Sequence, residues 1–175
     1  MTVYLVAGPP AVGKSTVTRL LAGSLPRCVL VDVDRIRDQM VVTGMVLPGP
    51  DWSPELTAQL TAARESACGI ARAYDRIGFD VVIDDFYDPF SRLTEYDALT
   101  DLRMNRILLL PTAEVARARN RARGEGGDFI DGGIDHVYGT MPARGELADA
   151  GWTVMDTSDL TAEQTRDRAL GLLHP

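Results

Sequence analysis

Eight residues near the N-terminus have the types and the spacing needed to hold a phosphate chain. Gly8 to Ser15 reads GPPAVGKS and matches the pattern G-x-x-x-x-G-K-[ST]. Glycines let the backbone curl so that successive N–H groups point at phosphate oxygens, and a helix that begins there adds positive potential. Lys14 can then reach the β- and γ-phosphates, while the Ser15 hydroxyl can bind a Mg²⁺ ion that bridges them. The segment therefore predicts a site for the phosphates of a nucleotide.

The use of lysine in this chain strengthens that prediction. Lys14 is the only lysine among 18 basic residues, all the others being arginine. The alternative, a glycine-proline turn that happens to precede a helix, does not explain why a chain that otherwise avoids lysine has one at this position. The residues expected to contact the nucleotide here are Gly8, Ala11, Val12, Gly13, Lys14, Ser15 and Thr16.

Two acidic groups follow predicted strands. Asp32 and Asp34 flank Val33 at the end of one apolar run, and Asp84 and Asp85 end another. In an open parallel sheet, ligands bind beyond the carboxyl ends of the strands. Phosphoryl transfer needs one carboxylate that deprotonates the attacking hydroxyl and another that holds Mg²⁺ directly or through water. Asp34 could also cap the next helix, and Asp85 could simply cap a turn.

Four arginines alternate with other residues late in the chain, at 117, 119, 121 and 123. On a helix, Arg119 and Arg123 share one face because they are four residues apart. The glycine-rich stretch 124–133 follows, and we expect it to be mobile. A solvated basic helix face is the alternative interpretation of this cluster.

Short apolar strands alternate with helical segments along the whole chain. Predicted strands cover 2–7, 27–32, 80–84, 104–110 and 152–156. Predicted helices cover 14–25, 34–42, 54–77 with Ser53 as cap, 88–100, a stretch capped by Thr112 that runs to 123, a further stretch to about 150, and a last one from about 161. This alternation predicts an α/β fold, with a mostly parallel five-stranded sheet covered on both faces and one domain over residues 1–175.

Composition excludes several classes of protein. The 175 residues carry a net charge of −7, which disfavours a partner such as duplex DNA. No apolar run is long enough for a membrane span and no signal peptide is evident, so we expect a cytoplasmic protein without a membrane partner. With two histidines and no CxxC pair, Cys28 and Cys68 are expected to be free thiols and a zinc site is not expected.

Five segments in order resemble a known family of small P-loop kinases. They are GPPAVGKST, VDVDRIRDQM, VVIDDFYDP, RARNRARG and WTVMDTSDLTAEQT. The family groups chloramphenicol phosphotransferase, zeta-toxin-like kinases and polynucleotide 5′-kinases. The resemblance implies the three-layer P-loop NTPase fold with a mobile arginine lid at about 117–133, and ATP and Mg²⁺ as cofactors.

The resemblance also implies roles for single residues. Asp34 is similar to the general base, Arg37 to an arginine near the substrate phosphate, and Asp32 to a carboxylate on the metal side with Ser15. Arg119 and Arg123 resemble lid residues that contact ATP and stabilise the transferring phosphoryl group. The turn 156–158, with Thr157 at its centre, is expected against the adenine.

The function expected from these features is transfer of the γ-phosphate of ATP to a hydroxyl group of a small molecule, an antibiotic- or sugar-like alcohol. The segment 43–55 contains no basic residue and two acids, Asp51 and Glu55, so it would repel a phosphate backbone. Four aromatic residues could wall an acceptor pocket or, being near strand ends, belong to the core: Trp52, Phe86, Tyr87 and Phe90. A polynucleotide 5′-hydroxyl kinase is the first alternative, and a P-loop ATPase or nucleotide-binding regulatory protein is the second. The sequence does not indicate an oligomeric state.

We predict that Lys14→Ala abolishes turnover while the protein stays folded. A contact that stabilises the transition state is worth a factor of about 10² to 10³ in rate. Steady-state ATP turnover, with circular dichroism as the control for folding, measures the effect. Retention of more than about a tenth of the wild-type rate would contradict the assignment.

Overall fold

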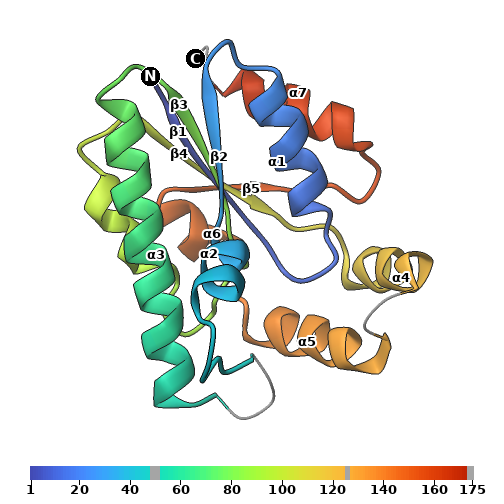
Figure 1. Ribbon diagram of the computed structural model, residues 1–175. Coiled ribbons are helices and arrows are strands. Elements are labelled where there is room, and N and C mark those ends of the chain that lie inside the picture. Colours follow the sequence, from blue (N-terminus) through green and yellow to red (C-terminus); the bar gives the residue numbers. More distant parts are fainter. Residues whose placement is uncertain (48–51, 125–126, 173–175) are drawn as a thin grey trace.

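A central sheet of five parallel strands organises the protein (Figure 1). The computed structural model describes residues 1–47, 52–124 and 127–172. The strands are β1 (Val3–Ala7), β2 (Cys28–Asp32), β3 (Asp80–Asp84), β4 (Met104–Leu109) and β5 (Trp152–Met155). Their order across the sheet is β2-β3-β1-β4-β5, and every neighbouring pair is parallel. The predicted five-stranded α/β architecture is thereby confirmed.

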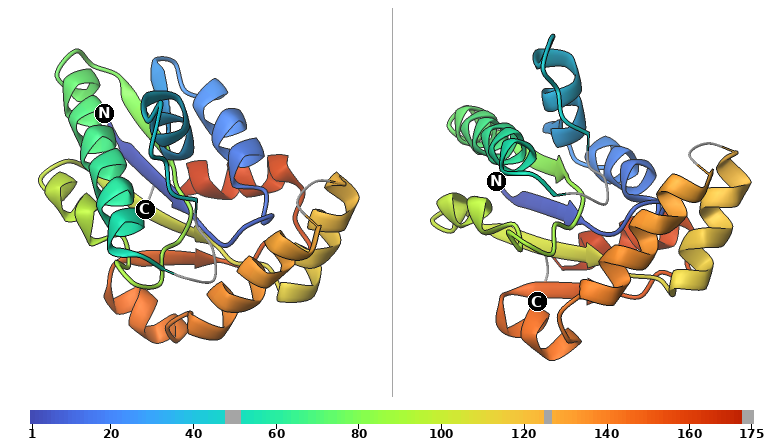
Figure 2. Two further views of the ribbon diagram at one scale, coloured as in Figure 1. Left: turned by 60° about the horizontal axis from the view of Figure 1, so that its bottom comes forward. Right: turned by 90° about the horizontal axis from the view of Figure 1, so that it is seen from below.

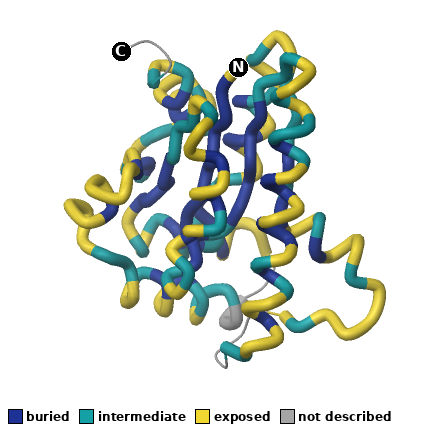
Figure 3. Tube along the Cα trace, turned by 90° about the vertical axis from the view of Figure 1, so that its left-hand side faces the viewer, coloured by how far each residue is buried: buried dark blue, intermediate teal, exposed yellow. Residues whose placement is uncertain are grey.

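Helices cover both faces of this sheet, which gives the three layers of a P-loop NTPase fold (Figure 2). One face packs against α3 (Pro54–Asp75), the 3-10 helix η1 (Thr94–Leu99) and α6 (Arg144–Asp149). The other face packs against α1 (Lys14–Gly23) and α7 (Ala162–Gly171). Strand β1 is buried along its whole length because it lies at the middle of the sheet (Figure 3).

Three further helices lie toward the carboxyl ends of the strands (Figure 1). They are α2 (Val33–Met40), α4 (Ala113–Arg123) and α5 (Gly127–Thr140). Since the carboxyl ends of parallel strands carry the ligands in open α/β sheets, these helices surround the expected site.

Local capping signals placed the helix starts correctly. The Ser53 hydroxyl accepts a hydrogen bond from the Leu56 N–H (3.1 Å), and the Thr112 hydroxyl accepts one from the Val115 N–H (3.3 Å). Both satisfy donors that the first turn of a helix leaves without a partner.

The predicted helix over 88–100 is wrong. Only the 3-10 helix Thr94–Leu99 forms there. The Asp88 carboxylate accepts hydrogen bonds from the N–H groups of Phe90 (2.8 Å) and Ser91 (3.3 Å), which gives the backbone a turn in place of a helix. Arg92 and Leu93 then adopt positive φ angles of 52° and 59°, which no right-handed helix allows.

The glycine-rich stretch also differs from the prediction. Residues 125 and 126 lie outside the described part, and Gly127–Thr140 forms helix α5, so the helix expected after the glycine-rich stretch 124–133 already begins within it. Buried Ile134 and Val137 attach this helix to the two apolar clusters, and their contribution outweighs the low helix propensity of glycine. A break at 141–143, which contains Pro142, separates α5 from α6.

Cys28 and Cys68 are free thiols, as expected. Within the described ranges, no helix combines the length and the apolar character that crossing a membrane requires.

Gly8→Ala is expected to destabilise the protein and Gly69→Ala to stabilise it. A Cβ atom at Gly8 would lie 2.6 Å from the Leu109 carbonyl oxygen on β4, so two central strands would have to move. Such overpacking costs about 1 to 3 kcal/mol. A Cβ at exposed Gly69 in α3 meets nothing within 4 Å, and alanine there should add about 0.5 to 1 kcal/mol of helix stability. Urea unfolding measures the stability of both variants. Equal unfolding midpoints for Gly8→Ala and the wild type would contradict the close approach of Gly8 to β4.

Candidate functional site

The phosphate loop connects β1 to α1 at the centre of the sheet edge. Its backbone turns through left-handed conformations at Ala11 (φ 61°) and Gly13 (φ 98°) before α1 begins at Lys14. Glycine adopts such angles without strain, whereas alanine does so at a cost. The sequence motif specifies Gly13 but leaves Ala11 variable, so the constraint at Ala11 could not be predicted from it.

A hollow of about 270 Å³ lies over this loop. Its lining residues come from the loop, from the first turns of α1 and from the end of α4: Ala11, Gly13, Lys14, Ser15, Thr16, Arg19 and Arg123. Five of these were predicted nucleotide contacts on the loop, and Arg123 was predicted on the lid. The structure therefore brings the predicted loop and lid residues to one place.

Lys14 is enclosed by charged groups from three other elements. Its ammonium group donates a hydrogen bond to the Pro9 carbonyl oxygen (3.0 Å), so the side chain curls back over its own loop. Burial lowers the pKa of Lys14 and nearby Arg123 lowers it further, while Asp84, Asp34 and Asp85 oppose the shift. The same lysine thus connects the phosphate loop electrostatically to both acidic groups found in the sequence.

Asp84 lies at the end of β3 beside the first turns of α1. The Thr18 hydroxyl donates a hydrogen bond to its carboxylate (3.1 Å), and the Ser15 side chain is near enough to lower the pKa of Asp84. Burial raises the pKa of Asp84, and attraction to Lys14 and the two hydroxyls opposes this rise. A carboxylate in contact with the motif serine has the chemistry to hold Mg²⁺ beside the phosphates.

Asp32, the residue predicted on the metal side, has a local structural role. Its carboxylate accepts a hydrogen bond from the Arg35 N–H (3.2 Å) and so caps α2. The capping role that the sequence left open for Asp34 therefore belongs to Asp32. Because Asp32 pairs with Asp84 across β2 and β3, it stays near the site, but the contact with Ser15 favours Asp84 as the metal-side carboxylate.

Asp34 lies in the first turn of α2 and remains accessible to solvent. Partial desolvation raises the pKa of its carboxyl group, while attraction to Lys14 and Arg37 opposes the shift. A carboxylate that is open on one side and faces the phosphate lysine on the other is suited to accept a proton from an incoming hydroxyl.

Arg37 is buried one turn further along α2, with 6% of its surface exposed. One guanidinium nitrogen has a long contact of 3.5 Å to Asp38. Within the described part of the chain, the Nε and Nη1 atoms have no hydrogen-bond partner. A buried cation with free donors next to Asp34 is available for oxygen atoms of a ligand.

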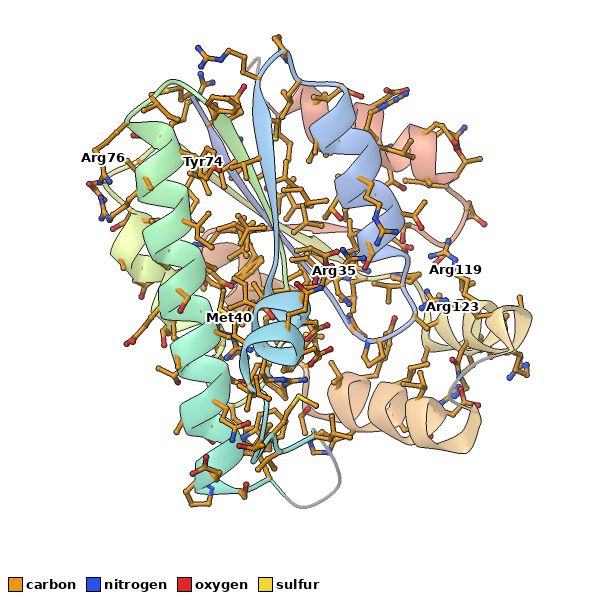
Figure 4. The ribbon with its side chains drawn as sticks, viewed as in Figure 1. Arg35, Met40, Tyr74, Arg76, Arg119 and Arg123 are labelled. Carbon is orange, nitrogen blue, oxygen red and sulfur yellow. The ribbon has the colours of Figure 1, made fainter. Side chains whose placement is uncertain are left out.

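The four arginines of α4 divide into two pairs. Arg119 and Arg123 lie on the side of the helix that faces the phosphate loop (Figure 4). Arg119 donates hydrogen bonds to the carbonyl oxygens of Val12 (2.9 Å) and Thr157 (2.8 Å). Arg117 forms an ion pair with Asp135 of α5, and Arg121 is exposed. The spacing of four residues correctly predicted that Arg119 and Arg123 share a face, and the structure shows that this face is turned toward the loop.

The turn after β5 closes the other side of this region. Its Asp156 carboxylate accepts two hydrogen bonds from Ser158, and the Ser158 hydroxyl also accepts one from the Thr112 N–H (2.9 Å). Thr157 is buried, and Arg119 connects its carbonyl group to the phosphate loop. The predicted adenine-side residue is thus next to the predicted lid residue.

Comparison with known protein families identifies the family to which the chain belongs. The sequence model of a family described as AAA domain matches residues 3–137. The chain belongs to this AAA domain family. The matched part of the AAA domain runs from β1 through the phosphate loop, both acidic groups and α4 into α5. A search of curated protein sequences finds no significant match.

Solved structures share the fold of this AAA domain at low sequence identity. A sugar kinase from Janibacter sp. has a TM-score of 0.70 at 19% identity, covering 99% of this chain and 94% of its own. A gluconokinase from Sinorhizobium meliloti has a TM-score of 0.63 at 17% identity, covering 98% and 91%. A tunicamycin resistance protein from Deinococcus radiodurans has a TM-score of 0.63 at 15% identity, covering 99% and 96%. The chain therefore shares the P-loop NTPase-like α/β fold of these proteins.

We predict that Asp84→Asn weakens the Mg²⁺-dependent binding of ADP far more than Asp32→Asn does. Asparagine at 84 removes the charge beside Ser15, whereas asparagine at 32 still caps α2. Second-sphere and ligand changes at metal sites cost about 10 to 100-fold in affinity. ADP titrations at several Mg²⁺ concentrations measure this, and a larger loss for Asp32→Asn would return the metal-side role to Asp32.

Proposed function

We propose that the protein is an ATP- and Mg²⁺-dependent kinase that transfers the γ-phosphate to a hydroxyl group of a small molecule. One arrangement carries this proposal. Asp84 contacts the motif serine on one side of Lys14, and solvent-accessible Asp34 faces Lys14 from another element. A metal-side carboxylate and a separate base around one phosphate site are what transfer to a hydroxyl requires.

The phosphate loop would hold the nucleotide. Its backbone N–H groups and Lys14 bind the β- and γ-phosphates, and Arg123 approaches them from α4. Ser15 and Asp84 are the residues that would hold Mg²⁺, which neutralises charge on the phosphate oxygens when it is bound.

Asp34 would then activate the acceptor. Its carboxylate takes the proton from the acceptor hydroxyl as the oxygen forms a bond to the γ-phosphorus. The bond from that phosphorus to the β–γ bridging oxygen breaks, and ADP leaves with the electron pair. Lys14 and Arg123 stabilise the charge that develops on the transferred group.

Helix α4 and the start of α5 would act as the lid over the nucleotide. Arg119 contacts the loop and the turn at Thr157, and these contacts would hold the base of the lid against the nucleotide site. Closure would bring Arg123 onto the phosphates and exclude water from the reaction.

A small acceptor fits the charge around the site. The net charge of −7 argues against a polynucleotide, and the part of 43–55 that the structure describes has no basic residue. Residues 48–51, with Asp51, lie outside the described ranges. The names of the structural neighbours, a sugar kinase, a gluconokinase and a tunicamycin resistance protein, support a small molecule.

One observation favours the alternative, a polynucleotide 5′-hydroxyl kinase. The free donors of buried Arg37 could bind an acceptor phosphate. They could equally bind the several oxygens of a sugar-like alcohol. Unlike a polynucleotide, such an acceptor needs no further basic residues around the site.

The direct test offers ATP and Mg²⁺ with two acceptor sets, a panel of sugars, sugar acids and hydroxylated antibiotics, and 5′-hydroxyl oligonucleotides. We expect phosphorylated product from the small-molecule panel. Efficient oligonucleotide phosphorylation that weakens as salt rises would establish the alternative. ATP hydrolysis at the same rate with and without every acceptor would indicate an ATPase.

Asp34→Asn should lower kcat with the best acceptor at least about 10²-fold, because asparagine cannot take the proton. Affinity for MgADP should change little, since Asp34 does not contact the phosphate loop through any hydrogen bond in the structure's described part. Loss of MgADP binding with the acceptor reaction preserved would instead make Asp34 a residue of the metal side.

A further inference from the structure

Arg64 of α3 is the most buried arginine in the described part of the chain, with 1% of its surface exposed. Its Nε atom donates to the Asp85 carboxylate (2.9 Å). Its Nη1 atom contacts Asp88, Ser91 and Glu95, each at 3.0 Å. One side chain from α3 therefore binds four residues of the segment that runs from β3 into η1.

That segment needs external support. Arg92 and Leu93 have consecutive positive φ angles although neither is glycine. Residues in such sparsely populated conformations persist only where their surroundings hold them. The Ser91 hydroxyl provides part of that support, because it binds Arg64 and also accepts a hydrogen bond from the Leu93 N–H (3.1 Å).

The beginning of the same segment is connected to the nucleotide side. The Asp85 N–H donates to the Val6 carbonyl (3.2 Å), and the Tyr87 N–H donates to the carbonyl of Gly8, the first residue of the phosphate loop (3.0 Å). Asp84, which contacts Ser15 and Thr18, directly precedes it. The segment therefore starts at the metal-side carboxylate.

The middle of the segment carries an aromatic side chain, Phe90, that is partly exposed to solvent. Phe90 is 57% exposed and packs between Trp52, at a ring distance of 4.9 Å, and His136 of α5, at 5.8 Å. Asp88 sets the position of Phe90, since one carboxylate oxygen binds the Phe90 N–H and the other binds Arg64. The Asp88 carboxylate therefore links Arg64 directly to the backbone of Phe90.

We propose that Arg64 is a positioning residue for the reaction: it fixes the connection of residues 85–93 so that Phe90 forms an acceptor-binding surface with Trp52 and His136 at a set place relative to the nucleotide. This rests on the proposed kinase function. The ring surface suits an acceptor with an apolar or CH-rich face, such as one side of a sugar ring or an antibiotic ring system.

The test compares the same substitution at two positions of α3. Arg64→Lys keeps the charge but cannot bind Asp85 and Asp88 with one planar group. The matched control is Arg72→Lys, because Arg72 also joins α3 to an aspartate, Asp101, but does so at the surface. Ser91→Ala is a milder second variant that removes one Arg64 contact and the bond to Leu93 without leaving a buried charge unpaired.

Three measurements separate positioning from general destabilisation. Hydrogen exchange of the 85–93 peptide should rise at least tenfold in Arg64→Lys and Ser91→Ala, while peptides from β1 and α1 keep wild-type rates. The Kd for MgADP should stay within about twofold, because the phosphate loop is unchanged. With the acceptor found in the panel above, KM for the acceptor should rise at least tenfold and KM for ATP should not. Arg72→Lys should match wild type in all three.

Two results would overturn the proposal. Unchanged exchange of residues 85–93 in Arg64→Lys would show that Arg64 does not hold the segment. Parallel loss of MgADP affinity and faster exchange throughout the sheet would show a structural role only. If no panel member is phosphorylated by the wild-type protein, the kinase proposal fails, while the exchange and MgADP measurements still decide whether Arg64 positions the segment.

Discussion

The pairing of β1 with β3 is the constraint on which the rest of the site depends. Their register places Val6 opposite Asp84, so the strand that leads into the phosphate loop lies beside the strand that ends in the acidic pair. Backbone hydrogen bonds set this register, and a shift by one residue would turn Asp84 to the other face of the sheet. The contacts of Asp84 with Ser15 and Thr18 follow from that register.

Charge at this edge is arranged around Lys14. Two carboxylates at the end of β3 and one from α2 favour its charged form, while burial and Arg123 disfavour it. These three carboxylates outnumber the two cations, so a phosphate chain would bind here more favourably together with a divalent cation such as Mg²⁺ than alone.

Apart from Lys14, the cationic side chains are arginines, and their burial and partners determine what each one does. Arg64 is enclosed and binds three carboxylates through its Nε and Nη1 atoms, Arg119 connects two carbonyl groups, and Arg37 is enclosed with free donors. A planar group with five donors suits each of these tasks better than an ammonium group. The same residue type therefore supports the framework at 64, joins α4 to the phosphate loop at 119, and leaves free donors in α2 at 37.

Much of this protein could be predicted from local patterns. The phosphate motif, the five apolar strands and the caps at Ser53 and Thr112 depend on residues close together in sequence, and the physics that acts on them is local. The spacing of Arg119 and Arg123 belongs to the same class, because helix geometry alone puts them on one face.

Tertiary structure decided what depends on distant partners. Asp32 and Asp84 look alike as acids at strand ends, and only strand order shows that Asp84 meets the motif serine while Asp32 caps α2. The helix expected over 88–100 is replaced by a turn because the Asp88 carboxylate binds local N–H groups on one side and Arg64, 24 residues earlier, on the other. Helix α5 begins within the glycine-rich stretch because Ile134 and Val137, further along the same helix, reach the core. In each case a contact between residues far apart in the chain adds to the local hydrogen bonds, and no local pattern contains that contact.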